Sequence, residues 1–545
     1  MRWFNRIVLV SCLFAVLGLP ARAYAQGDDL APVIAVSSRL ADPATCTDRF
    51  VPHTLDHLTT TDDGVVRMFE ANGAGLAVGD LDNDGDLDLV LGGEDQPNSI
   101  LWNRGDFTFD TARWGDGHTR AVTIVDVDAD GLRDIVLTTN IGAVNYWRNQ
   151  GDRTFTRVFL PNVAHPAYVL GWYDLDGDGD LDLVTAPYDA GFLTDRGSEY
   201  RMNGSGVYVY ENRGDRLVPT RLTGEAQAFA LAFEDVNDDQ RPDILVGNDF
   251  AVPDFAFVQT DDGWAQTDLF AATTHSTMSF DLGDINNDGK PELFATDMKP
   301  YADDPALMAA YAPLMAGMSE EMHMEGDPQI MENVLQFPAP RGFANRAADW
   351  GVDGTGWSWS AKFGDLDQDG LLDLYVVNGM AEETMFAHLP DHELVEENQA
   401  LRNTGDGFTP MAAWGLNATA GGRAMSMADL DGDGDLDIVV NNLRAPAMLY
   451  ENQLCGGAAL VVQLAQPGVQ NRDAVGARVG LLTDKGLFIR DVRAASGYLS
   501  GDPAQVHFGL PADATPIHLE ILWPDGAISL IDNPQANTLL RVERQ

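Results

Sequence analysis

The sequence predicts an all-β protein. An acidic motif, D-x-D-x-D-G-x-x-D or a close variant, occurs seven times, with starts 46 to 81 residues apart. Short apolar runs rich in β-branched residues flank the copies, as in DLDLVLGG, which is typical of strands rather than helices. Most copies are followed by a second turn sequence such as NRGD, a hairpin signal. Four antiparallel strands per repeat of roughly 45–50 residues is the size of a propeller blade. We therefore expect a seven-bladed β-propeller over residues 46–455 and, over residues 456–545, a small β-domain of short strands and turns.

The N-terminus is predicted to be a signal peptide, residues 1–25. Arg2 and Arg6 precede an apolar run, and Ala23-Tyr24-Ala25 offers a cleavage pattern of small residues. The sequence therefore predicts a protein exported to the periplasm or the extracellular space. Lipidation at Cys12, which ends a lipobox-like Leu9-Val10-Ser11-Cys12, is the alternative. Residues 26–45 are predicted to be a linker.

The apolar run of the signal peptide is too short to span a membrane, and no other stretch of 18 apolar residues follows it. We therefore expect no integral membrane span. The chain has 34 Lys and Arg residues against 84 Asp and Glu residues, a net charge of −50. This balance excludes nucleic acid as the main partner, because phosphate contacts need clustered cations. A compact chain with so many carboxylates is self-repelling unless cations lie among them.

The spacing of the acidic motif suits a hard cation. Calcium takes six to eight oxygen ligands, which positions 1, 3, 5 and 9 of a tight loop can supply together with a backbone carbonyl at position 7. Glycine at position 6 permits the sharp turn. We therefore predict up to seven Ca²⁺ sites. The candidate ligands are Asp80, Asp82, Asp84, Asp86 and Asp88; Asp126, Asp128, Asp130 and Asp134; Asp174, Asp176, Asp178, Asp180 and Asp182; Asp235, Asn237, Asp239 and Asp243; Asp284, Asn286, Asp288 and Glu292; Asp365, Asp367, Asp369 and Asp373; and Asp429, Asp431, Asp433, Asp435 and Asp437.

Two other interpretations of these loops fit the sequence less well. An EF-hand needs a glutamate at position 12 and flanking helices, but the seven copies have Leu, Thr, Val or Ala at that position and strand-like flanks. A solvated acidic linker would not repeat seven times between strands. The fourth and fifth sites are expected to bind more weakly. The fourth has Asn237 at position 3 and Gln240 in place of glycine, and the fifth has Asn286 at position 3 and Glu292 at position 9.

These repeats resemble FG-GAP/VCBS repeats, the family that includes the propellers of integrin α-subunits. The tail resembles the ASPIC/UnbV domain at Gly476–Val479, Ser496–Ser500, His507–Leu510 and Trp523–Gly526. The two together resemble the cartilage acidic protein/UnbV family. The resemblance implies an extracellular calcium-binding protein and supplies no established reaction.

Three insertions, at 188–205, 299–331 and 380–398, each lie between the second and third strands of a repeat. They are therefore expected on the propeller face opposite the acidic loops. The same face should carry a candidate ligand site made of His118, Arg120, His165, His275, Trp357 and Arg423. We expect a binding or adhesion module whose protein or glycan partner docks there. The alternative is an enzyme or biosynthetic accessory protein of UnbV type that uses the central funnel.

Two segments contain residue types that ligate transition metals, but each fits a structural role better. His388, Asp391 and His392 are read as a loop and the start of a helix, and the methionines of 299–331 as an insertion packed on apolar surface.

The seventh repeat lacks a fourth strand. Residues 49–55, just before the first repeat, resemble that strand and could close the ring by pairing with the third strand of the seventh repeat. Cys46 would then lie beside Cys455, the other cysteine outside the signal peptide. We therefore predict a disulfide that joins Cys46 to Cys455.

Overall fold

The computed structural model describes residues 30–42, 45–140, 142–196, 206–214, 216–250, 252–321 and 327–545. Most of its regular elements are strands, which confirms the all-β prediction. The predicted signal peptide and the alternative lipidation site at Cys12 lie outside the described residues, as do parts of the insertions at 188–205 and 299–331.

Within the described chain, seven sheets share one plan of four antiparallel strands, and we number these blades in chain order. From the inside outwards, the strands of blades one to four are β3 (Leu76–Gly79), β4 (Asp88–Leu91), β5 (Asn98–Asn103) and β6 (Phe109–Trp114); β7 (Thr119–Val125), β8 (Asp134–Thr139), β9 (Asn145–Asn149) and β10 (Phe155–Val158); β11 (Val169–Tyr173), β12 (Asp182–Ala186), β13 (Tyr208–Asn212) and β14 (Leu217–Arg221); and β15 (Ala228–Glu234), β16 (Asp243–Asn248), β17 (Phe255–Thr260) and β18 (Gly263–Gln266).

Blades five to seven follow the same plan. Their strands are β20 (Phe280–Gly283), β21 (Glu292–Ala295), β24 (Val334–Ala339) and β25 (Gly342–Asn345); β26 (Gly356–Gly364), β27 (Asp373–Asn378), β30 (Gln399–Asn403) and β31 (Phe408–Pro410); and β32 (Gly421–Ala428), β33 (Asp437–Leu443), β34 (Pro446–Gln453) and β2 (Arg49–Leu58). Each innermost strand contacts the next one, and β32 contacts β3, so the sheets form a closed propeller.

The core lies mainly between neighbouring blades. Phe294 of β21, for example, belongs to the same buried cluster as Leu374 and Val376 of β27. Glycine at the end of an innermost strand allows the next blade to pack closely against that strand. A Cβ on Gly79, for example, would lie only 2.9 Å from Ile124 Cγ2 of the next blade. The glycine before the first aspartate of that loop is therefore a packing residue.

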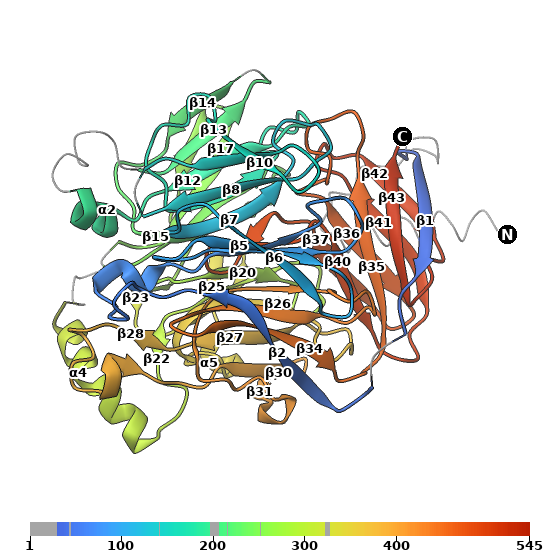
Figure 1. The fold of residues 1–545 in the computed structure, drawn as a ribbon. Coiled ribbons are helices and arrows are strands. Elements are labelled where there is room, and N and C mark those ends of the chain that lie inside the picture. Colours follow the sequence, from blue (N-terminus) through green and yellow to red (C-terminus); the bar gives the residue numbers. More distant parts are fainter. Residues whose placement is uncertain are drawn as a thin grey trace.

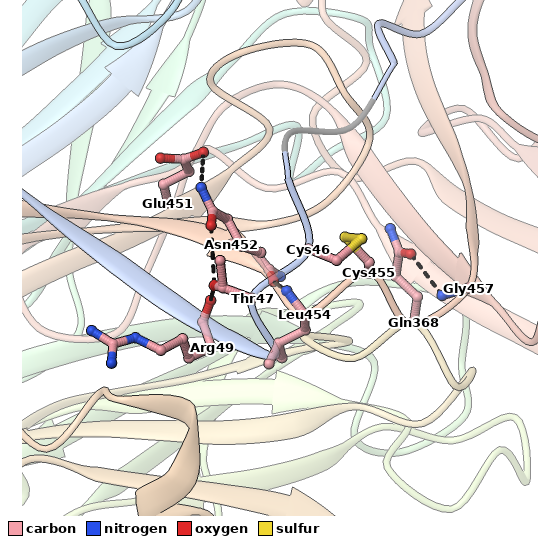
Figure 2. The surroundings of a disulfide bond; sticks show 10 residues. Cys46, Thr47, Arg49, Gln368, Glu451, Asn452, Leu454, Cys455 and Gly457 are labelled. Atoms are coloured by element: carbon pink, nitrogen blue, oxygen red, sulfur yellow. Dashed lines mark hydrogen bonds between the residues drawn. A yellow bond between two sulfur atoms is a disulfide. The ribbon is translucent and has the colours of Figure 1, made fainter.

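The first and last parts of the propeller pair as predicted. Strand β2 runs antiparallel to β34, with Arg49 opposite Gln453 and Thr54 opposite Met448. The predicted disulfide between Cys46 and Cys455 is present, with their Cα atoms 5.6 Å apart (Figure 2). Two residues further on, Gly457 N–H donates to Gln368 Oε1 in the acidic loop of blade six.

The C-terminal domain consists of two four-stranded sheets that enclose their own apolar core. The first contains β1 (Val33–Arg39), β43 (Thr538–Arg544), β35 (Ala458–Ala465) and β40 (Val506–Leu510), and the second contains β37 (Leu487–Asp491), β36 (Arg478–Thr483), β41 (Pro516–Leu522) and β42 (Ile528–Asp532). The prediction of a linker over 26–45 was wrong for residues 33–39, because β1 pairs along its whole length with β43.

The C-terminal domain and the insertions lie at opposite ends of the propeller (Figure 1). The domain covers the acidic loops: Asn471 N–H, for example, donates to Gly179 O, and Gln470 Nε2 donates to Asp126 O. The other end carries α2 (Asp189–Arg196) and α4 (Pro305–Glu321), as predicted for insertions that follow a second strand. Short elements complete the fold: β19 (Thr273–Thr274), β22 (Met298–Lys299), β23 (Gln329–Ile330), β28 (Met380–Ala381), β29 (Glu393–Leu394), α5 (Ala347–Trp350), and the 3-10 helices Met68–Asn72, Pro390–His392 and Ala412–Trp414.

Candidate metal centres and the two ends of the propeller

The acidic loops bring their predicted ligands together. In at least four of them, three carboxylates have oxygens within 4.8 Å of one another, a spacing that one cation can bridge. These groups are Asp80, Asp82 and Asp88; Asp126, Asp128 and Asp134; Asp174, Asp176 and Asp178; and Asp365, Asp367 and Asp373. All the donors are hard oxygens, which suits calcium or magnesium better than a transition metal.

The acid at position 9 also holds the loop in place. In the first loop, Asp88 accepts hydrogen bonds from Leu81 N–H (3.0 Å) and from Asn103 N–H (2.9 Å). One bond fixes the start of the loop and the other ties it to the third strand of the same blade. The same pair of backbone donors is found on Asp134, Asp182, Asp243, Asp373 and Asp437. Each carboxylate keeps lone pairs free for a cation.

The asparagine that ends the third strand was read from the sequence only as part of a turn. In the structure it also links neighbouring blades. Asn149 Nδ2 donates to Leu81 O in the preceding acidic loop at 2.7 Å. Equivalent bonds join Asn103 to Leu430, Asn403 to Ile285 and Asn452 to Leu366, and in the fourth blade the glutamine Gln259 bonds Leu175 in the same way. The recurrence of this asparagine in the sequence could have indicated a structural role. The carbonyl oxygen that it binds, however, lies in another repeat and could not be identified from the sequence.

The loops carry carboxylates in an unfavourable environment. Burial, opposed by the two backbone hydrogen bonds, raises the pKa of Asp88 to about 7 and that of Asp182 to about 8. Burial and the charges of Asp178, Asp176 and Asp174 raise the pKa of Asp180 to about 7. Desolvation and like charges both disfavour the ionised form, and the attraction of a bound cation would offset both effects.

Arginine side chains lie against several of the loops. Arg153 Nη2 is 2.6 Å from Asp82 Oδ2, and the guanidinium of Arg153 also stacks on Trp102. Arg402 lies 2.5 Å from Asp367 and 2.8 Å from Asp369. A metal ion in loops one and six would therefore compete with a neighbouring guanidinium for these carboxylates.

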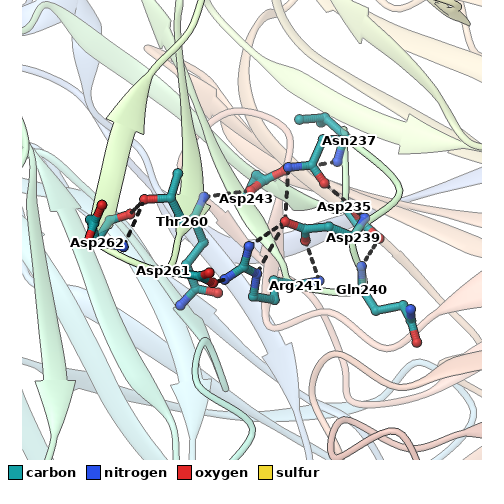
Figure 3. Close-up of polar contacts among 12 residues, drawn as sticks. Asp235, Asn237, Asp239, Gln240, Arg241, Asp243, Thr260, Asp261 and Asp262 are labelled. Atoms are coloured by element: carbon teal, nitrogen blue, oxygen red, sulfur yellow. Dashed lines mark hydrogen bonds and ion pairs between the residues drawn. The ribbon is translucent and has the colours of Figure 1, made fainter.

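The fourth loop differs because its arginine lies within the loop (Figure 3). Arg241, at position 7, donates through Nη2 to Asp239 Oδ2 at 2.7 Å and pairs through Nη1 with Asp261. Burial of Asp239 is outweighed by its hydrogen bonds from Arg241, so its pKa is lowered. Gln240 occupies the turn position in the left-handed conformation, φ 68°, which glycine adopts without strain.

The fifth loop is also altered internally. Glu292 at position 9 accepts a hydrogen bond from Asn286 Nδ2 at 3.0 Å and another from Ile285 N–H at 3.2 Å. Burial raises the pKa of Glu292 to about 9. One candidate ligand is therefore hydrogen-bonded to another.

Four of the six residues of the predicted ligand site are buried in the structure. Arg120, His275, Trp357 and Arg423 are only 2%, 5%, 5% and 1% exposed. Arg120 forms an ion pair with the buried Glu94, and Trp357 is covered by Tyr311 of α4 and by Phe386. Two insertions thus cover Trp357, through Tyr311 and Phe386, and sequence spacing could not show this packing.

The other two residues of the predicted site lie nearer the surface but do not join one site. His118 is 3.5 Å from Asp95, whereas His165 stacks on Tyr208 of another blade with ring centroids 3.9 Å apart. Of the histidines considered as metal ligands, His388 donates instead to Ala310 O of α4.

The propeller axis is filled from the opposite end. A hairpin of the C-terminal domain, β38 (Ala495–Ser496) and β39 (Ser500–Gly501), joins the sheet of blade one, where β39 runs parallel to β3. Its tip residue Tyr498 is fully buried and packs edge-on against Trp359 of blade six. Gly497 N–H donates to Phe280 O of blade five. The hairpin therefore contacts several innermost strands at once.

A cavity of about 130 Å³ remains between the C-terminal domain and blades five to seven. Its lining includes Asp365 and Asp429, at position 1 of loops six and seven, and Arg490 and His507 from the domain. Among the described helices, none has the length and apolar character that crossing a membrane would require.

Known families match both parts of this architecture. The family described as FG-GAP-like repeat matches residues 80–136, 126–185, 235–295 and 391–440. The family described as ASPIC and UnbV matches residues 468–545. The chain therefore contains FG-GAP-like repeats followed by a C-terminal segment that matches the ASPIC and UnbV domain.

Similar proteins include a curated relative and several solved structures. Cartilage acidic protein 1 of Xenopus tropicalis is 23% identical over 504 residues, which cover 83% of this chain and 70% of that protein. BBS1N, solved in complex with ARL6DN and soaked with lead, is 10% identical with a TM-score of 0.39, over 78% of this chain and 98% of that one. YCF48 from Cyanidioschyzon merolae is 10% identical with a TM-score of 0.38, over 70% and 96%.

Proposed function

We propose that this FG-GAP-repeat protein is an exported, calcium-binding module whose partner protein docks on the end of the propeller that carries the insertions. The observation that carries this proposal is the distribution of exposed apolar side chains. In the described part of the propeller, every large apolar side chain that is exposed lies at that end, namely Leu58, Val158, Phe159, Phe250, Met308, Met385 and Val395. Apolar side chains exposed together mark interaction surfaces, and their concentration at one end is the basis for placing the partner there.

Calcium is the cofactor that the acidic loops suit best. Their ligands are oxygens only, the loops are preformed by backbone hydrogen bonds, and the carboxylates are held together against their mutual repulsion. Calcium accepts the irregular coordination that flexible loops and backbone carbonyls provide, whereas magnesium demands near-octahedral geometry. We expect the fourth and fifth loops to bind more weakly, because Arg241 and Asn286 already occupy their acids.

Export is supported by the disulfide between Cys46 and Cys455, because such bonds persist in oxidising compartments. The sequence pattern of residues 1–25 points the same way. The alternative function, an enzyme whose active site is the central funnel, is less well supported than a binding function. Arg120 and Arg423 are buried there, and Tyr498 fills the axis. The geometry therefore favours binding over catalysis.

Site-specific photocrosslinking tests the docking face. A photoreactive amino acid replaces Met308 or Phe250 at the proposed face, and Val469 in the C-terminal domain serves as the matched exposed control. Each protein is then illuminated in an envelope extract of the producing cells. We expect one discrete product from positions 308 and 250 that Val395→Glu diminishes, and none from position 469. Products from position 469 alone, or from no position, would contradict the docking face.

A further inference from the structure

The cavity between the C-terminal domain and the propeller contains a guanidinium edge that has no hydrogen-bond partner among the described residues. Arg490 of β37 is held by a hydrogen bond from Nη1 to Ile489 O (2.8 Å), and it lies 5.6 Å from the ring centroid of Phe508. Its Nε and Nη2 atoms are buried, and neither has a hydrogen-bond partner among the described residues. These two nitrogens form one edge of the planar fork, which matches the two oxygens of a carboxylate.

A second unsatisfied group lines the same cavity and has the opposite character. His507 Nε2 lies 2.9 Å from Gly434 O. A carbonyl oxygen only accepts, so Nε2 carries the proton and Nδ1 presents a lone pair. Nδ1 is buried, and the described chain offers it no donor. A ligand that satisfies both groups must therefore accept hydrogen bonds from Arg490 and donate a hydrogen bond to Nδ1 of His507.

The remaining charges of the cavity are mostly paired. Lys362 pairs with Asp502, Arg493 with Asp281 at 2.7 Å, and Asp491 with Arg478 at 2.8 Å. Asp365 and Asp429 remain, each the first carboxylate of an acidic loop. Calcium in loops six and seven would engage these two carboxylates. Arg490 forms no ion pair among the described residues, although Asp365 and Asp284 attract its charge. Calcium bound at Asp365 would weaken that attraction.

We propose that this cavity binds a small hydroxy-carboxylate, with its carboxylate on the Nε–Nη2 edge of Arg490 and its hydroxyl donating to Nδ1 of His507. The available volume is that of about four water molecules at roughly 30 Å³ each, enough for an organic acid of a few heavy atoms. The proposal rests on the proposed function in one respect: calcium must first engage Asp365 and Asp429, which would otherwise repel an anion.

Ligand-observed NMR on the calcium-loaded full chain tests this site, with glycolate, acetate and inorganic phosphate as probes. We expect glycolate to bind more tightly than acetate, which lacks the hydroxyl, and more tightly than phosphate. Arg490→Gln should weaken glycolate binding by roughly ten- to a hundredfold, the range for losing hydrogen bonds to a charged group. Arg490→Lys should also weaken it, because it keeps the charge and loses the fork.

Two further variants make the test specific. His507→Phe should reduce the preference for glycolate over acetate, and Arg541→Gln, an exposed change in the same domain, should leave binding unchanged. Melting curves of each variant show whether it is folded. Failure of glycolate to bind the calcium-loaded protein, equal binding by folded Arg490→Gln, or tighter binding of phosphate would overturn the proposal.

Failure of calcium binding is a separate outcome. Calorimetric titration with calcium alone tests the proposed function directly. If the protein takes no calcium, the double variant Asp365→Asn and Asp429→Asn removes the two repelling charges without metal. This folded variant should then bind glycolate in the presence of chelator, and its failure to do so would overturn the cavity proposal independently.

Discussion

The third and fourth acidic loops lie in neighbouring blades and have the same backbone frame but different charge. Both begin with an aspartate and end with one that accepts two backbone hydrogen bonds, Asp182 in the third and Asp243 in the fourth. The third adds Asp176, Asp178 and Asp180, whose charges oppose one another. The fourth has Asn237, Gln240 and Arg241 in place of an acid, a glycine and another acid. The backbone conformation of the loop therefore does not depend on the set of carboxylates that would require a cation.

The largest effect should come from removing all metal. A site that binds only the native state stabilises it by about 2.7 kcal/mol when free ligand is a hundred times Kd, and several such sites act together. We expect excess chelator to lower Tm by roughly 10 °C or more. Differential scanning calorimetry measures this. An unchanged melting curve after confirmed metal removal would show that the third loop, like the fourth, needs no cation.

The second effect is a pH dependence that calcium should abolish. Burial and neighbouring carboxylates raise the pKa of Asp180 to about 7 and burial raises that of Asp182 to about 8, whereas unfolded aspartate titrates near 3.9. The native state therefore holds protons that the unfolded state has lost, so the calcium-free protein should become less stable as pH rises from about 4 to about 8.

With calcium bound, these carboxylates are ionised in the native state, and the same rise in pH should not destabilise the protein. Melting temperatures at pH 5 and pH 8, with calcium and with chelator, check this. A calcium-free protein that gains stability over that range would contradict the assignment of raised pKa values to the third loop.

A matched pair of alanine substitutions comes next in size. Asp176→Ala removes a position-3 carboxylate from the third loop and should reduce stability in calcium by up to about 2.7 kcal/mol. Asn237→Ala, at the same position of the fourth loop, should change it by less than about 0.5 kcal/mol, as for an ordinary surface change. Denaturant unfolding in calcium measures both. In chelator, the difference between the two variants should shrink, and a difference that persists would point to a structural role for Asp176.

The smallest expected effect is a gain. Asn237→Asp, Gln240→Gly and Arg241→Asp together give the fourth loop the ligand types of the third. Relief of the left-handed Gln240 should itself contribute about 1 kcal/mol, independent of metal. In calcium the triple variant should be more stable still, and titration should find tighter calcium binding by one site per chain. An unaltered calcium isotherm would mean that the ligand set is not what separates the two loops.

The repeats, ring closure and disulfide were predictable from sequence because each depends on local pattern. Residues 49–55 resemble the fourth strand of the other repeats, and the disulfide between Cys46 and Cys455 follows from the pairing of that strand with the seventh repeat. The central hairpin was not predictable: β38 and β39 are two residues each, too short for any periodicity, and their partner β3 lies more than 400 residues away. Strand β1 was missed because it is an exposed edge strand. The burial of Arg423 and Trp357 depends on how distant insertions pack, which spacing does not encode.

Calcium titration of the metal-stripped, full-length chain by isothermal titration calorimetry is the most direct test of the central claim that the acidic loops are calcium sites. We predict that the chain binds several calcium ions in a tight class and that loops four and five contribute a weaker class. Asp176→Ala should remove one ion from the tight class, while Asn237→Ala leaves that class intact. A metal-stripped, folded protein that shows no calcium binding would contradict the account.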